Sequence, residues 1–306
     1  TITLTDAADN ASSLTLSTFV IDTTAPTISA IATSAFSWGA VLNSTEDNSN
    51  GTVTVTTSGA EDGQTVTITL NSATYTATVS SNSATVTISA AGLQALTDGS
   101  SYTMTADVSD AAGNAATQVT SSSFSVDTTA PTISAIATSA FSWGAVLNST
   151  EDNSNGTVTV TTSGAEDGQT VTITLNSATY TATVSSNSAT VTISAAGLQA
   201  LTDGSSYTMT ADVSDACGNA ASTVTSSSFS VDVTPPTLTE TTAVTTPTND
   251  TTPSVVITSD EAGTITSSLG FSTTTSGSAA ANTITFTTLS EGTYSDVTVT
   301  FTDAAG

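Results

Sequence analysis

The sequence contains no lysine, no arginine and no histidine. Its 26 aspartate and glutamate residues therefore have no cationic side chain with which to form an ion pair, and the formal net charge is −26. Phosphate contacts need cationic side chains, so neither nucleic acid nor an anionic membrane surface is expected as a partner. Catalysis by histidine, lysine or arginine is excluded, and no pattern indicates the cleft that a pair of catalytic carboxylates requires. We therefore expect that the protein is not an enzyme.

Cysteine and long apolar runs are equally scarce. Cys217 is the single cysteine, so no disulfide can form within the chain, and stability must come from hydrophobic cores and any bound ions. We expect Cys217 in an exposed hairpin, where it is either inert or cross-links neighbouring chains; inertness is favoured because no cation nearby stabilises the thiolate. No stretch of about 18 apolar residues predicts membrane insertion. The first residues lack a signal-peptide pattern, so we expect an internal or processed piece of a longer protein.

The chain does contain a long internal repeat. Asp22, Asp127 and Asp232 are 105 residues apart, and each precedes a short proline-containing stretch that cannot continue a central strand. Residues 23–127 (repeat 1) and 128–232 (repeat 2) differ at only three positions. The predicted domains are the C-terminal hairpin of a preceding immunoglobulin-like domain (1–22), repeat 1, repeat 2, and a diverged third copy that lacks its last strand (233–306, called segment 3).

Alternation of apolar residues with threonine or serine predicts β-strands throughout each repeat. Turn-forming residues such as Asp98-Gly99 separate the runs, which gives about seven strands in about 105 residues, the count of an immunoglobulin-like sandwich. A helical turn is expected at 90–96, a tyrosine corner at Tyr102, and packing in the core rather than ligand stacking for Trp38. The predicted fold class is all-β: tandem immunoglobulin-like β-sandwiches arranged as an extended string of beads.

The two ends of the chain overlap in sequence. Thr298–Gly306 matches Thr1–Asp9, so segment 3 stops before a seventh strand. The favoured explanation is that the missing strand follows Gly306 in a longer chain. The alternative is a filament of identical chains, in which Leu14–Asp22 of one subunit completes segment 3 of the next by strand addition.

Three motifs carry a family resemblance. They are Asp110–Asn114 with its copy Asp215–Asn219, Val126–Thr132 with its counterparts at the other junctions, and Gly51–Leu70. In these the chain resembles the bacterial immunoglobulin-like repeats of giant secreted surface proteins, including the RTX-type repeat adhesins exported by type I secretion. The resemblance implies a spacer between functional ends, a location at the bacterial cell surface, and calcium in the loops or between repeats.

The positions of the carboxylates also predict calcium. In such a sandwich the second-to-third and sixth-to-seventh loops lie at the end where the chain enters, together with the preceding linker. Carboxylates that converge without cations repel one another, whereas Ca²⁺ takes six to eight oxygen ligands. The predicted calcium ligands are Asp22, Glu61, Asp62 and Asp110 for repeat 1, Asp127, Glu166, Asp167 and Asp215 for repeat 2, and Asp232, Asp260, Glu261 and Asp303 for segment 3.

Each of these features also has a simpler interpretation. The acidic residues could be solvated turn residues, although the absence of cations favours calcium. Glu46–Gly51 resembles the start of an EF-hand loop but lacks the later acidic ligand, so an Asx-rich turn is expected. Matches to the N-glycosylation pattern, at Asn10, Asn43, Asn50, Asn148, Asn155 and Asn249, are frequent by chance in a Thr/Ser-rich chain.

Two functions of different classes remain open from the sequence. The first is a structural extender of a large extracellular surface or filament protein, stiffened by calcium at the repeat junctions, with the neighbouring repeats as its partners. The second is an adhesive module that binds a glycan or a protein directly. A distinctive aromatic patch or a long loop would favour the second, and neither repeat shows one.

Overall fold

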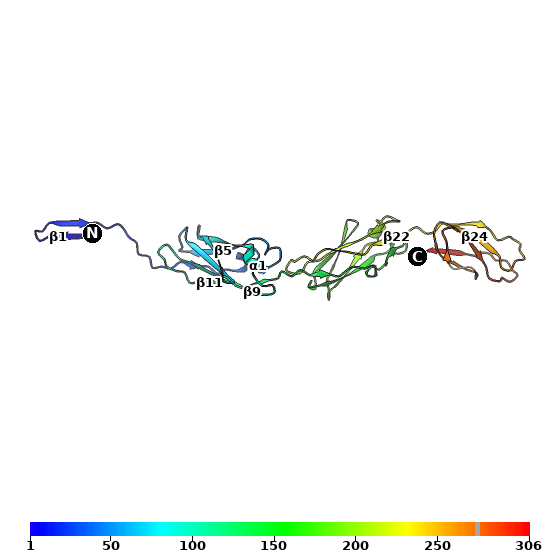
Figure 1. Cartoon of the computed structure of the whole chain (residues 1–306), viewed down its shortest axis with the longest axis horizontal. Helices are drawn as coiled ribbons and strands as arrows, with labels where there is room; N and C mark the ends of the chain where they lie inside the picture. The colour runs from blue at the N-terminus through cyan, green and yellow to red at the C-terminus, as the bar shows by residue number, and fades with distance from the viewer. Residues whose placement is uncertain (273–275) are drawn as a thin grey trace. The chain divides into compact units, whose positions relative to one another are not determined.

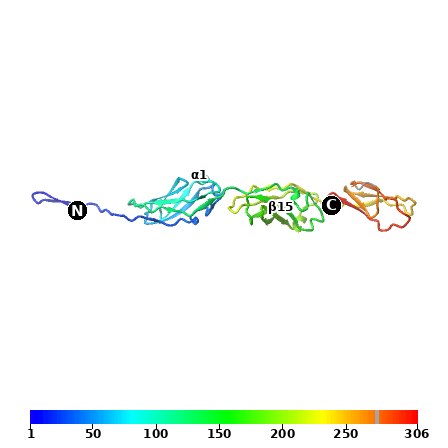
Figure 2. The same ribbon diagram turned by 90° about the horizontal axis from the view of Figure 1, so that it is seen from below.

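The computed structural model describes residues 1–272 and 276–306. The chain divides into two compact units: unit 1 comprises Thr1–Ala130 with Cys217–Asn219, and unit 2 comprises Pro131–Ala216 with Ala220–Gly306. Strands dominate both units, and the helices are short (Figures 1 and 2). The described residues contain no helix with the length and apolar character needed to span a membrane.

Unit 1 begins with an exposed hairpin and continues into the sandwich of repeat 1. The hairpin pairs β1 (Ile2–Thr5) with β2 (Ala11–Leu14), antiparallel. The elements of repeat 1 are β3 (Thr27–Ile28), η1 (Thr33–Ala35), β4 (Val41–Leu42), β5 (Gly51–Ser58), β6 (Thr65–Leu70), β7 (Ala73–Thr78), β8 (Ser83–Ile88), α1 (Ala90–Gln94), β9 (Ser101–Tyr102), β10 (Thr105–Val108), β11 (Val119–Thr120) and β12 (Phe124–Val126).

Three sheets build repeat 1, with strand orders β3-β5-β8, β11-β10-β6-β7 and β4-β12-β9. The pairing of β12 with β4 is parallel, whereas β12 pairs with β9 in the antiparallel direction. Alternate residues of β5 are buried, because valines point inward and threonines point outward from a sheet that is covered on one face. This arrangement is the all-β immunoglobulin-like sandwich predicted from the sequence.

The core of repeat 1 confirms three expectations about single elements. Trp38 is 5% exposed and stacks on Phe36, with Phe124 against its edge, so it packs in the core. The hydroxyl of Tyr102 accepts a hydrogen bond from the backbone N–H of Thr97 at 2.9 Å, which is the tyrosine corner. The predicted helical turn is α1.

Unit 2 contains a second sandwich of the same design and a smaller core from segment 3. The elements of repeat 2 are β13 (Thr132–Ile133), η2 (Thr138–Ala140), β14 (Val146–Leu147), β15 (Gly156–Ser163), β16 (Thr170–Leu175), β17 (Ala178–Thr183), β18 (Ser188–Ile193), α2 (Ala195–Gln199), β19 (Ser206–Tyr207), β20 (Thr210–Asp212), β21 (Val224–Thr225) and β22 (Phe229–Val231). Its sheet orders are those of repeat 1, namely β13-β15-β18, β17-β16-β20-β21 and β14-β22-β19.

Segment 3 has fewer strands around a smaller core. Its strands are β23 (Leu238–Thr242), β24 (Ser254–Ser259), β25 (Gly263–Ser267), β26 (Ser276–Gly277), β27 (Ala281–Thr285) and β28 (Val299–Asp303). They form the sheets β23-β24-β27 and β26-β25-β28 around a core of Val255, Ile265, Ile284 and Phe286.

Candidate metal centre

The loops at the head of repeat 1 meet where the sequence places them. The backbone N–H of Ala111 donates to Oε2 of Glu61 at 2.8 Å, which joins the sixth-to-seventh loop to the second-to-third loop. The side-chain amide of Asn114 donates to the backbone carbonyl of Asp22 at 3.1 Å, which adds the preceding linker. The predicted convergence of these three chain segments is therefore present in unit 1.

Asp110 at this head is already occupied by hydrogen bonds. Its Oδ1 accepts from the backbone N–H of Asn114 at 2.8 Å and its Oδ2 from the side-chain amide of the same residue at 2.9 Å. The side-chain bond from Asn114 is the main cause that holds the pKa of Asp110 below its usual range. Asp110 is 4% exposed, so it acts first as the organiser of its own loop.

Three of the predicted ligands point to backbone N–H groups instead of to the junction. Oδ1 of Asp62 accepts from Ser81, Oδ1 of Asp167 from Ser186, and Oδ1 of Asp260 from Thr237, each at 2.7 Å. The bond from the Thr237 backbone is the largest cause that lowers the pKa of Asp260. Adjacent loop residues project in different directions, so only one acid of each pair faces the head.

Repeat 2 keeps the bonds that depend only on its own loops. Oε2 of Glu166 accepts from the backbone N–H of Ala216 at 2.8 Å, and Asp215 is 4% exposed, as Asp110 is in repeat 1. Asp127, at the end of unit 1, accepts at Oδ1 from the Thr129 N–H at 3.3 Å and at its backbone carbonyl from the side-chain amide of Asn219 at 3.0 Å.

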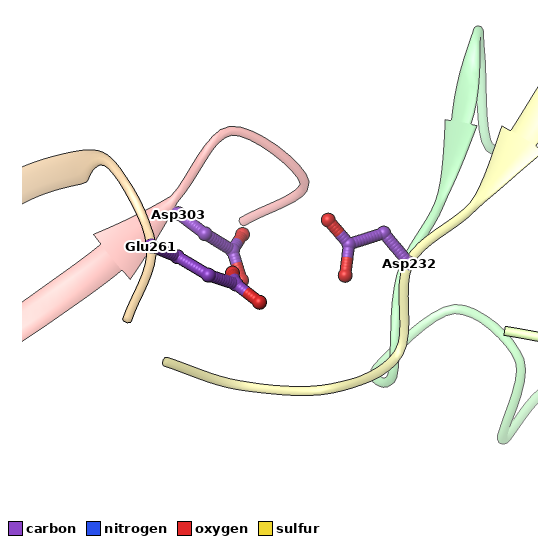
Figure 3. Close-up of side chains that lie close together, drawn as sticks. All are labelled: Asp232, Glu261 and Asp303. Atoms are coloured by element: carbon purple, nitrogen blue, oxygen red, sulfur yellow. The ribbon is translucent and has the colours of Figure 1, made fainter. Parts of the chain in front are cut away.

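Within unit 2, three acidic side chains converge closely. Asp232 follows β22, Glu261 lies in the turn between β24 and β25, and Asp303 ends β28. One carboxylate oxygen from each lies within 4.8 Å of the other two, and this is the one such trio among the described residues. Figure 3 shows Glu261 and Asp303 side by side, directed toward Asp232 across a gap. All three are predicted calcium ligands.

The negative charges of these three carboxylates repel one another. Burial raises the pKa of Asp232, and the charges of Asp303 and Asp203 raise it further. Burial also raises the pKa of Glu261, with Asp232 and Asp303 as the next causes. Asp303 is held in place because its Oδ1 accepts from the backbone N–H groups of Ala305 and Gly306, each at 2.8 Å. A fixed group of mutually repelling carboxylates is what a divalent cation stabilises.

The surroundings of the trio fit a calcium ion chemically. A cleft of about 200 Å³ lies beside it and is lined by Asp232, Asp303 and the linker residues Val233–Pro236. Three carboxylates offer up to six oxygens, and Ca²⁺ takes six to eight oxygen ligands, including backbone carbonyls and water. The donor set contains only hard oxygen ligands, which favours calcium over metals that need nitrogen or sulfur.

Sequence reasoning missed Asp98 and its copy Asp203. Asp203 accepts from the backbone N–H of Val233 at 2.9 Å and from the hydroxyl of Thr234 at 2.5 Å, so it fastens the linker that follows Asp232. Asp98 makes the same bonds to Thr128 and Thr129. Each Asp precedes a glycine and was interpreted only as a turn. The available signal is that this Asp recurs in both repeats, two residues after a Leu and shortly before the tyrosine corner.

Segment 3 also carries a groove. Its volume is about 1040 Å³, and its lining includes Val255, Phe286, Leu289 and Tyr294. Tyr294 is 44% exposed and Val297 is 36% exposed.

No protein-family model and no curated protein matches the chain. Similar solved structures do exist. One, of a Ca²⁺-stabilized adhesin by which an Antarctic bacterium binds ice, has 28% identity and a TM-score of 0.46, and the match covers 93% of this chain and 72% of that one. Another, of a 1.5-MDa bacterial ice-binding adhesin, has 28% identity, a TM-score of 0.41 and coverages of 76% and 73%.

A bacterial immunoglobulin-like domain from the ice-binding adhesin of Marinomonas primoryensis is also similar. Its identity is 30% and its TM-score 0.25, and the match covers 33% of this chain and 95% of that domain. These three similar structures are of bacterial ice-binding adhesins, the class of protein that the sequence motifs resemble.

Proposed function

We propose that this chain is an extender region of a large extracellular bacterial adhesin, in which calcium bound by acidic residues stiffens the junctions between domains. The proposed domains are the hairpin of residues 1–22, repeat 1, repeat 2 and segment 3. Repeat 1, repeat 2 and segment 3 each contain a hydrophobic core of their own, which supports this division. The neighbouring repeats of the same long chain are the partners. The similarity to adhesin domains supports an extender role and a location outside the cell.

One observation carries the calcium part of the proposal. The carboxylates of Asp232, Glu261 and Asp303 come from three separate stretches of the chain and still place an oxygen each within 4.8 Å of one another. Asp232 belongs to repeat 2, whereas Glu261 and Asp303 belong to segment 3. An ion bound by all three would join the end of repeat 2 to the head of segment 3. The equivalent residues at the other junctions are proposed as sites of the same kind.

Calorimetric titration of the full chain with Ca²⁺ tests the proposal. We expect saturable binding, and a rise in the melting temperature because the ion binds the folded state preferentially; the gain is about 2.7 kcal/mol when free ion is about a hundredfold above the dissociation constant. Glu261→Gln should remove one site and its share of that stabilisation. Glu291→Gln, the same change in an exposed loop of segment 3, is the matched control. Absence of binding by the parent chain, or equal binding by both variants, would contradict the calcium site.

A further inference from the structure

Asn43 of repeat 1 and Asn148 of repeat 2 occupy equivalent positions, and each begins the tetrapeptide Asn-Ser-Thr-Glu. We call residues 43–46 and 148–151 the NSTE loop. The sequence predicts only an Asx-rich turn in the adjoining stretch. None of the proposed calcium ligands belongs to the NSTE loop, although Asn148 and Ser149 line the cleft beside them. Its hydrogen bonds show a more specific arrangement.

The NSTE loop fixes its asparagine with three local hydrogen bonds. In repeat 2, Oδ1 of Asn148 accepts from the backbone N–H groups of Thr150 and Glu151, both at 3.0 Å. The backbone N–H of Asn148 donates to Oε2 of Glu151 at 3.1 Å. This reciprocal pattern is that of a capping box. None of these three bonds uses the side-chain N–H₂ group of Asn148.

That remaining donor binds the next part of the chain. Nδ2 of Asn148 donates to the backbone carbonyl of Ala305 at 2.9 Å. Ala305 belongs to the turn Asp303–Gly306, which Asp303 holds rigid through its two backbone bonds. We call residues 303–306, and the equivalent residues 110–113 and 215–218, the DAxG turn. The acceptor carbonyl is therefore as firmly positioned as the donor.

The same contact occurs a second time, in unit 1. Nδ2 of Asn43 donates to the backbone carbonyl of Cys217 at 3.0 Å, and the N–H of Ser44 donates to Oδ1 of Asn219 at 2.8 Å. Asn219 is 0% exposed, whereas Asn114, its counterpart in repeat 1, is only half-buried. Two copies of one donor loop thus meet two different copies of one acceptor turn.

The glycine of the DAxG turn explains why the contact is close. A Cβ on Gly306 or on Gly218 would lie 3.4 Å from the amide nitrogen of Asn148 or Asn43, and both glycines have positive φ. Gly113, in a DAxG turn that no NSTE loop covers, has no atom within 4 Å of such a Cβ. Cys217 stands at the variable position of the turn, and its backbone carbonyl is the acceptor.

We infer that the NSTE loop is a docking site for the DAxG turn of the domain that follows it, and that this contact orients the two domains without a bound ion. Recognition depends on one amide donor, one backbone carbonyl and one glycine. A domain with an NSTE loop therefore selects a following domain with a DAxG turn. Segment 3 contains no asparagine followed three positions later by glutamate, so it lacks this docking site.

The test measures the orientation of repeat 2 and segment 3 in the full chain. Spin labels are attached to Thr190→Cys and Thr283→Cys, two exposed strand positions, in a Cys217→Ala background that copies the alanine of repeat 1. The distance distribution is recorded in chelator, so that calcium contributes nothing. Asn148→Asp keeps the Oδ1 acceptor of the capping box and removes the N–H₂ donor. Asn148→Ser supplies a hydroxyl acceptor for the capping box without adding a charge, and its side chain is too short to replace the amide donor to Ala305.

Both Asn148 variants should broaden the distribution of distances between the spin labels at positions 190 and 283 when chelator is present. Loss of one neutral hydrogen bond corresponds to a roughly fivefold rise in the ratio of undocked to docked joints. Asn43→Ser, the same change in the other repeat, should leave the distribution unchanged. The inference is overturned if neither Asn148 variant differs from the parent, if only the charged variant does, or if Asn43→Ser broadens the distribution equally. Because no calcium is present, failure of the proposed calcium site does not affect this result.

Discussion

The carboxylate of Asp203 and the hydroxyl of Thr234 lie 2.5 Å apart, so an aspartate of repeat 2 holds the first residues of segment 3. The same aspartate accepts from the backbone N–H of Val233 at 2.9 Å. These bonds sit beside Asp232, the residue that repeat 2 contributes to the acidic trio. Fixing the linker therefore also fixes one of the three carboxylates.

Replacement of Asp203 should loosen this linker locally. In Asp203→Ala we expect the amide proton of Val233 to exchange faster with solvent, while the amide of Thr128, which Asp98 holds in repeat 1, exchanges as before. Hydrogen bonds from Thr234 and Val233 lower the pKa of Asp203. Its ionised form is thus favoured by folding, and the protection should be lost as pH falls through that lowered pKa. Unchanged exchange at Val233 would show that the linker is held by other contacts.

The acidic trio should respond to pH in opposite ways with and without calcium. Burial and neighbouring charges raise the folded-state pKa values of Asp232 and Glu261, so without calcium the folded state gains stability as pH falls through these values. With calcium, acid protonates the ligands and releases the ion, so stability falls. Melting curves at neutral and mildly acidic pH measure both effects: acid should raise the melting temperature in chelator and lower it in calcium. The double variant Asp232→Asn with Glu261→Gln should abolish the stabilisation by acid in chelator and reduce the destabilisation by acid in calcium by the share of this one site. If neither response changes, other residues are responsible.

Gly51 should not tolerate a side chain. A Cβ at this position would lie 2.5 Å from Cζ3 of Trp38 and 3.1 Å from Cδ1 of Leu93, both within the core. Overpacking of this kind costs about 1–3 kcal/mol, so Gly51→Ala should lower the stability of repeat 1 by that amount. Gly292→Ala is the control, because nothing lies within 4 Å of its Cβ. Scanning calorimetry should show a lower melting temperature for the unfolding transition of repeat 1 alone. If Gly51→Ala shifts this temperature as little as Gly292→Ala does, Trp38 moves aside without cost and the prediction is wrong.

The groove of segment 3 should accept a seventh strand. A peptide of residues 14–22 has the strand sequence that precedes the first linker, and its Phe19 and Ile21 are 74% and 79% exposed in the chain. We expect it to raise the melting temperature of segment 3 by binding the folded state. The same peptide with aspartate at both positions should not bind. Sedimentation at increasing concentration then decides whether identical chains supply the strand to one another, since donation predicts a rising mass.

Much of the architecture follows from local patterns. The alternation of valine and threonine in 52–57 predicts a strand with one buried face, because side chains of a strand alternate between its two faces. Tyr102 is predictable because a tyrosine after Asp-Gly at the start of the sixth strand has a known geometric role. Such features depend on neighbours in sequence, or on the general design of the sandwich.

The direction of each acidic side chain at the site does not follow from the local sequence. Glu61 and Asp62 are adjacent and equally acidic, yet one bonds the loop of Ala111 and the other the turn of Ser81. In segment 3 the assignment is reversed: the first acid, Asp260, bonds Thr237, and the second, Glu261, joins the trio. The direction of a loop side chain depends on backbone torsions that composition does not specify. The contact of Asn148 with Ala305 does not follow from the sequence, because the two residues are 157 positions apart.

The parallel pairing of β4 with β12 has a mechanical consequence. In repeat 1, Val126 lies opposite Leu42, and the N–H of Asp127 donates to the carbonyl of Leu42 at 3.0 Å. β4 lies near the start of the repeat and β12 at its end. A pull on the two ends of the chain therefore draws these parallel strands in opposite directions along their length. Their hydrogen bonds are loaded together in shear and must break together, instead of opening one after another as in a hairpin pulled from its free ends.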